Sequence, residues 1–175
     1  MRKAGRGVTS LHMSLRLPRA AHLRLRVRSY DLELDNVISI LSDVCEFAQS
    51  KRGVFRVGGF GQAQWPVDVR TDLCVVLEQL PEVLAAVKSG KPTVLDFYEQ
   101  GIQRRITFTP AAANYEMTCT AFSRYWEPSP ATERIGRVAL GRMLSGVLDE
   151  FMGFMRCVAP ALEQHPWIRI WLQPP

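Results

Sequence analysis

Apolar and polar residues alternate along the chain with two different periods, which predict where strands and helices lie. Residues 23–34 alternate with a period of two, which is typical of a strand. The alternation shifts by one residue near Ser29, and because such a shift exchanges the two faces, we expect a bulge or a break there. Residues 54–60 predict a second short strand, which ends in a glycine-rich stretch.

A period near 3.6 predicts helices in three parts of the chain. Apolar residues recur at helical spacing over residues 36–50, and the Lys-Arg-Gly that follows is typical of a helix end. Residues 71–88 predict one broken helix or two short ones, because Pro81 fits the first turn of a helix. Residues 131–158 predict a long helix with a wide apolar face.

Three further strands are expected over residues 93–99, 103–109 and 115–122, because short segments with turn-forming residues separate them. Consecutive strands joined by short turns favour an antiparallel meander. Residues 167–172 are expected to form a last strand before the terminal prolines.

The first 22 residues have no regular period, and they predict a basic, disordered tail. Residues 23–175 are long enough for one domain with its own core. The predicted fold is therefore a single α+β domain, in which an antiparallel sheet (meander 93–122) packs against helices 36–50 and 131–158.

Charge is distributed unevenly along the chain. The formal net charge is +5, but residues 1–30 contain eight basic residues and no acidic one, whereas residues 31–175 contain 14 basic and 17 acidic residues. A basic segment attracts nucleic acid, so a small nucleic-acid-binding protein that uses Arg24, Arg26 and Arg28 is one alternative. A charged strand edge that resists aggregation explains the same residues, and we do not expect nucleic acid as the partner.

The composition and the cysteine positions favour a globular protein of a reducing compartment. The chain is 47% hydrophobic and 22% charged, as in ordinary globular proteins, and no apolar run reaches the ~18–20 residues of a membrane helix. No secretory signal is evident, and four widely spaced cysteines are expected to be reduced thiols. We therefore expect a cytoplasmic protein that does not bind membranes.

The sequence offers little for catalysis or metal binding. No two of the Cys and His residues have the spacing of a zinc site, and we expect neither a metal nor another cofactor. The glycines at 58–61 match neither the dinucleotide nor the P-loop fingerprint. A small enzyme that uses Asp96, Glu99 and His165 is a second alternative, but a strand would place Asp96 and Glu99 on opposite faces. We expect a chain that is not an enzyme.

Asp96 and Tyr98 share one face of their predicted strand, whereas Leu95 and Phe97 share the other. An aromatic ring next to acidic groups is typical of a protein recognition surface. An ordinary solvated strand face explains the same pattern.

The order of the predicted elements resembles the small α+β immunity proteins of bacterial polymorphic-toxin and contact-dependent growth inhibition systems. The resemblance covers residues 30–172 and includes Gly-Gly-Phe-Gly at 58–61, Trp-Pro-Val-Asp at 65–68 and Leu-Asp-Phe-Tyr-Glu-Gln-Gly-Ile at 95–102. It implies a protein without catalytic residues that binds a cognate toxin domain, encoded beside it, and blocks the toxin's active site or substrate access. The candidate contacts with the toxin are Asp68, Asp72, Asp96, Tyr98, Glu99 and Glu116.

Overall fold

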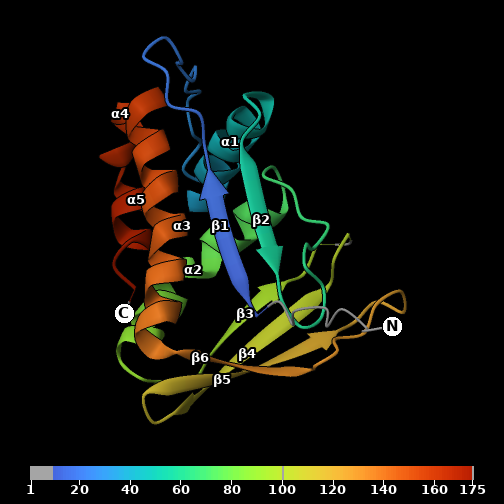
Figure 1. The fold of residues 1–175 in the computed structure, drawn as a ribbon. Helices are drawn as coiled ribbons and strands as arrows, with labels where there is room; N and C mark the ends of the chain where they lie inside the picture. Colours follow the sequence, from blue (N-terminus) through green and yellow to red (C-terminus); the bar gives the residue numbers. More distant parts are fainter. Residues whose placement is uncertain (1–9, 100, 175) are drawn as a thin grey trace.

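Five helices and two antiparallel sheets form within residues 10–99 and 101–174, which are the residues that the computed structural model describes (Figure 1). The elements in chain order are β1 (His12–Arg16), α1 (Val37–Ser50), β2 (Val54–Gly58), α2 (Asp72–Lys88), β3 (Thr93–Phe97), β4 (Arg104–Ala111), β5 (Asn114–Ala121), β6 (Thr132–Gly136), α3 (Arg137–Val158), α4 (Pro160–Glu163) and α5 (Pro166–Trp171). The α+β class is confirmed.

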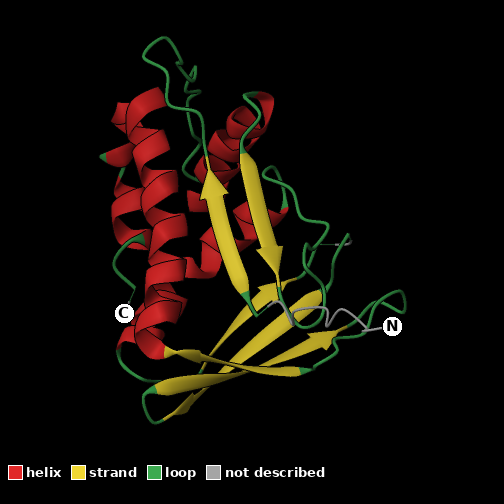
Figure 2. Ribbon diagram, in the orientation of Figure 1, coloured by secondary structure: helices red, strands yellow, loops and turns green. Residues whose placement is uncertain are grey.

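The larger sheet is a meander in which β3, β4, β5 and β6 lie side by side in chain order. The register places Ile106 opposite Leu95 and Cys119, and these buried side chains form one face of the sheet. Figure 2 shows the described helices on that side of the sheet, whereas no described helix covers the opposite face. The predicted meander is therefore confirmed, with β6 as an additional strand.

The smaller sheet pairs β1 with β2, and it corrects the expectation of a disordered tail over residues 1–22. Leu11, Met13 and Leu17 of this segment are buried and belong to the main hydrophobic core. Met13 lies opposite Val57 of β2, which is fully buried. Residues 1–9 of the expected tail lie outside the described residues, but residues 10–17 are part of the fold.

Residues 23–34 do not form the expected strand. Leu23 and Leu25 still pack against the core while Arg24, between them, is exposed, so the chain alternates as an extended segment does. The segment has no strand partner within residues 10–99 and 101–174, and Leu25 N–H instead donates to the Val158 carbonyl at the end of α3, at 2.9 Å. The alternation correctly indicates an extended backbone, but a strand also needs the edge of another strand with which to form hydrogen bonds.

The start of one helix and the type of the last element also differ from the sequence prediction. The long helix begins at Arg137 rather than at residue 131, because Thr132–Gly136 form β6. Residues 167–172 were expected to form a strand, but Pro166–Trp171 form helix α5. Pro166 occupies the first turn of this helix and the His165 side chain accepts a hydrogen bond from Trp167 N–H, so a cap and a proline begin the helix.

Helix α2 is one continuous helix although it contains Pro81. Proline has no backbone N–H, so the carbonyl of Leu77, four residues earlier, lacks its helical donor. The indole N–H of Trp171 in α5 donates to this carbonyl at 3.1 Å. The C-terminal helix thus satisfies the group that the proline leaves free.

Two polar side chains join separate elements. Glu133 of β6 is buried, and its carboxylate accepts the N–H groups of Leu11 at 2.6 Å and Phe60 at 2.5 Å. Gln79 of α2 bonds both the N–H and the carbonyl of Asp96 on the outer edge of β3. Glu133 therefore links the two sheets. Gln79 occupies the hydrogen-bonding groups of Asp96, so that they are not free to pair with another strand.

Candidate functional site

The six predicted contact residues lie on three parts of the structure, of which the first two are close enough for Glu99 to repel Asp72. Asp96 and Tyr98 lie at the end of β3, with Glu99 in the turn that follows. Asp68 and Asp72 lie at the start of α2. The sixth, Glu116, is on β5, where it lies 3.9 Å from Arg134.

The Asp68–Asp72 segment is a helix-starting turn. The Asp68 carboxylate accepts hydrogen bonds from the Thr71 N–H at 2.7 Å and from its hydroxyl at 2.8 Å. Asp72 accepts the Asp68 N–H at 2.9 Å and is only 6% exposed. Asp72 therefore stabilises the turn from inside, whereas Asp68 remains at the surface.

Substitution of Asp72 by Asn is expected to change how stability depends on pH. Burial raises the pKa of Asp72 from 3.8 to about 6, with Asp68 and Glu99 adding repulsion. Asp72 therefore binds a proton more readily in the folded state than in the unfolded state, which adds to the unfolding free energy at pH 4. This contribution is lost as pH rises through 6 and Asp72 ionises. The unfolding free energy of Asp72→Asn minus that of the wild type should therefore rise by up to ~3 kcal/mol between pH 4 and pH 7, because Asn does not ionise.

Urea unfolding at several pH values measures this difference. The exposed carboxylate variant Glu116→Gln serves as the control and should follow the wild-type curve. A curve for Asp72→Asn that runs parallel to the wild type between pH 4 and pH 7 would contradict the assignment.

Exposed aromatic side chains lie where β3 and β5 end and β4 begins, and in the loop that follows β5. We call Tyr98, Phe122 and Tyr125 the aromatic surface; their exposed fractions are 52%, 54% and 98%. Tyr98 and Phe122 line a hollow of about 310 Å³, whose other lining residues are Asp96, Phe97, Gln103 and Arg105. Aromatic rings around a hollow are typical of sites that anchor a partner's side chain.

An ion pair forms part of this hollow. Asp96 and Arg105 are opposite each other in the β3–β4 register, and Arg105 Nε donates to the Asp96 carboxylate at 2.9 Å. The same guanidinium lies over the Phe122 ring, 5.4 Å from its centroid. Arg105 thus connects the acidic and aromatic walls of the hollow.

Tyr98 is held by a bond to helix α2. Its hydroxyl donates to the Glu78 carboxylate at 2.6 Å. Partial burial of the ring and this bond to Glu78 raise the pKa of Tyr98 above its ordinary value. The phenol is therefore protonated at neutral pH, and its ring has a fixed orientation in the aromatic surface.

A stacked arginine supports the loop that carries Phe122 and Tyr125. The Arg104 guanidinium lies 4.4 Å from the Trp65 ring centroid and 3.6 Å from that of Trp126, which belongs to this loop. Burial lowers the pKa of Arg104 to about 10, so the side chain is still charged at neutral pH. The two cation–π contacts fix the loop against the core.

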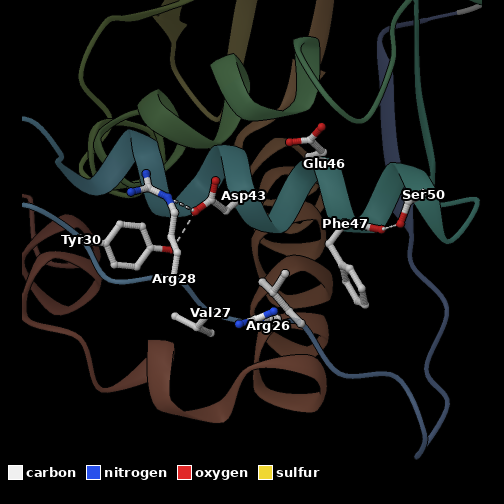
Figure 3. Close-up of a pocket in the computed structure, with 9 residues that line it drawn as sticks. Arg26, Val27, Arg28, Tyr30, Asp43, Glu46, Phe47 and Ser50 are labelled. Atoms are coloured by element: carbon white, nitrogen blue, oxygen red, sulfur yellow. Dashed lines mark hydrogen bonds and ion pairs between the residues drawn. The ribbon is translucent and has the colours of Figure 1, made fainter.

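A second hollow, of about 300 Å³, lies between residues 25–30 and α1 (Figure 3). Arg28 and Tyr30 both point to Asp43 of α1, with Arg28 Nε and the Tyr30 hydroxyl each donating at 3.0 Å. Arg28 also makes two bonds to Asp35, at 2.9 and 2.7 Å. The charges of Arg28 are thus already paired within the chain.

The two alternatives from the sequence can be compared with these positions. His165 caps α5 and packs against Tyr30 and Trp167, whereas Asp96 bonds Arg105; within the described residues no hydrogen bond joins Asp96, Glu99 and His165. Arg24, Arg26 and Arg28 do not lie on a strand. Arg28 is paired with two carboxylates and Arg24 donates to the carbonyls of Ala21 and Leu23.

The sequence analysis missed Phe122, Tyr125 and Arg105 as parts of a site. Phe122, Tyr125 and Trp126 fall within a span of five residues shortly before the Pro-Ser-Pro at 128–130, and this density of aromatic residues was the available signal. Arg105 could be found only through its register with Asp96.

Comparisons with models of known protein families, with curated proteins and with solved structures found no match for the chain. Among the described residues, no group of three or more His, Cys, Asp or Glu side chains is placed to hold a metal ion. None of the helices in the described segments has the length and apolar character needed to cross a bilayer.

Proposed function

We propose that this chain is an immunity protein that binds a cognate bacterial toxin domain in the cytoplasm and blocks its action. The proposal combines the resemblance in element order with the surface chemistry at the ends of β3, β4 and β5. In this proposal the chain acts by covering part of the toxin and carries out no reaction of its own.

The observation that carries the proposal is the aromatic surface. Monomeric proteins bury most aromatic rings, whereas interface centres are enriched in Tyr, Trp, Phe and Arg. Tyr98 and Phe122 are fixed by contacts with Glu78 and Arg105, so little ordering of side chains is needed when a partner binds. The hollow between them is suited to a protruding side chain of the toxin domain.

The free acidic group beside the hollow favours a basic or polar partner. Glu99 follows Tyr98 and has no ion-pair partner among the described residues, whereas the charge of Asp96 is already paired with Arg105. Acidic groups at an interface rim mainly increase the rate of association with a basic partner. Glu116, another residue predicted from the sequence, is six residues from Phe122 along β5, which is about 20 Å at the usual rise of a strand. It therefore lies away from the hollow.

Replacing Tyr98 or Phe122 by Ala is expected to weaken binding of the toxin domain encoded beside this chain. Each truncation removes an exposed ring from the centre of the proposed interface, so Kd should rise about 10- to 100-fold. Isothermal titration calorimetry measures the change, and growth of cells that express the toxin measures loss of protection.

Tyr98→Phe is the matched control, since it keeps the ring and removes only the hydroxyl that bonds Glu78. Its Kd should stay within about fivefold of the wild type, because one partly exposed hydrogen bond contributes about 1 kcal/mol or less. Wild-type affinity in both Ala variants would reject the aromatic surface as the binding site. A neighbouring toxin domain that the wild-type chain does not bind would reject the function.

A further inference from the structure

A second exposed apolar feature lies in the turn before α1. We call Asp31–Asp35 the leucine turn, because Leu32 and Leu34 are 84% and 85% exposed. Ile38, in the first turn of α1, is also exposed. Single exposed leucines are ordinary, but three neighbouring aliphatic side chains on one short segment need a physical reason.

The leucine turn is fixed by its own hydrogen bonds. The Asp31 carboxylate accepts the N–H groups of Glu33 at 2.8 Å and Leu34 at 3.2 Å. Asp35 N–H donates to the Asp31 carbonyl, and the Asp35 carboxylate accepts Asp31 N–H, both at 2.9 Å. Two aspartates thus close the turn at both ends, although neither leucine is buried.

The turn is also fastened to the rest of the protein. Arg28 holds Asp35 with two bonds and Asp43 of α1 with a third, while Tyr30 bonds the same Asp43. The Tyr30 ring packs against His165 and Trp167 at the start of α5. The bonds to Asp43, which Figure 3 shows, anchor the segment before the turn to α1, and the ring contacts of Tyr30 anchor it to the start of α5.

Leu32 and Leu34 themselves add nothing to the core, because both side chains are exposed. A pre-ordered turn reduces the entropy lost when a partner covers it. A hollow of about 380 Å³, lined in part by Ile38, Ser39 and Ser42, lies next to the turn and offers space for a partner's side chain.

The negative charges of the leucine turn indicate what kind of partner it would bind. Glu33 lies between the two leucines and Asp31 precedes them, and neither carboxylate has an ion-pair partner among the residues described. A complementary surface would have an apolar recess for the leucines with Lys or Arg side chains at its border.

We propose that the leucine turn is a second anchor for the toxin domain, inserted into an apolar recess of the toxin that basic side chains border. This inference rests on the proposed function, but it concerns a surface that shares no residue with the aromatic surface. Two separate anchors would fix the orientation of the bound toxin domain.

The test uses the full chain and the toxin domain encoded beside it. Leu32→Ala and Leu34→Ala should each raise Kd about 10-fold, and the double variant about 100-fold, because each removes an exposed aliphatic side chain that binding would bury. Glu33→Lys should slow association several-fold at low salt, since the rim charge is reversed. Val138→Ala, which truncates another exposed aliphatic side chain on α3, is the matched control and should bind as the wild type does.

Thermal unfolding should be unchanged in these variants, because the altered side chains are exposed. Wild-type affinity in the double Leu variant, together with weakened binding by Tyr98→Ala, would overturn the leucine turn as an anchor and leave the proposed function intact. A toxin domain that fails to bind even the wild-type chain would overturn both proposals.

Discussion

Met13→Asp is expected to destabilise the protein severely. Met13 lies in β1 opposite Val57 and is 5% exposed, so the substitution places a carboxylate in the apolar core. Burying an unpaired charge costs several kcal/mol, and the loss should be at least ~4 kcal/mol in unfolding free energy. Because the total stability of a domain is about 5–15 kcal/mol, this loss removes between about a quarter and most of it, and the urea midpoint of the variant should fall sharply.

Ser14→Asp is the matched control, since Ser14 is the next residue of the same strand and is exposed. Its unfolding free energy should lie within about 0.5 kcal/mol of the wild type. Urea unfolding followed by circular dichroism measures both variants. Equal stability of Met13→Asp and Ser14→Asp would show that β1 is not part of the core.

Glu133→Gln is expected to produce the second large loss. The buried carboxylate of Glu133 accepts two backbone N–H groups, one from Leu11 next to β1 and one from Phe60 after β2. An amide has only one acceptor oxygen, so its NH₂ group would face one of the two N–H donors. Losing a charge-assisted bond and leaving a buried donor unpaired should cost about 2–4 kcal/mol.

The control for this substitution is Glu116→Gln, because Glu116 is an exposed carboxylate on the neighbouring strand. It should change the unfolding free energy by less than about 0.5 kcal/mol. If the two Gln variants unfold at the same urea concentration, Glu133 does not link the sheets as the structure indicates.

The sequence predicted those elements whose own residues bury one face. Helix α1 and the three strands β3, β4 and β5 agree closely with the expected ranges, because their apolar residues repeat with the right period and turns separate them. Strand β6 was not predicted, since its inward position is occupied by Glu133 and the apolar alternation is lost. The buried role of Glu133 depends on N–H groups that are distant in sequence.

The two alternating segments near the N-terminus show why pattern alone is insufficient. Residues 23–28 alternate apolar and polar residues, and so do residues 11–17, an alternation that the expectation of a tail without a regular period overlooked. The first segment forms β1 because β2 offers it a free edge, whereas the second finds no edge and remains an extended segment against α3. Basic composition favoured disorder for the first segment, but its apolar side chains are buried.

The candidate site was only partly predictable for a similar reason. Asp96 and Tyr98 were found because a single strand places them on one face. Phe122 and Arg105 join them through strand register, and Tyr125 joins them through a loop that Arg104 holds by stacking on two tryptophans. Register and stacking involve residues far apart along the chain, so local patterns do not reveal them.

Amide hydrogen exchange of the full chain, measured with and without the toxin domain encoded beside it, tests the central claim most directly. The proposed function predicts slower exchange in the bound state around Tyr98 and in residues 122–127, and the leucine turn should become protected as well. Unchanged exchange in those segments, or protection confined to β1 and β2, would contradict it.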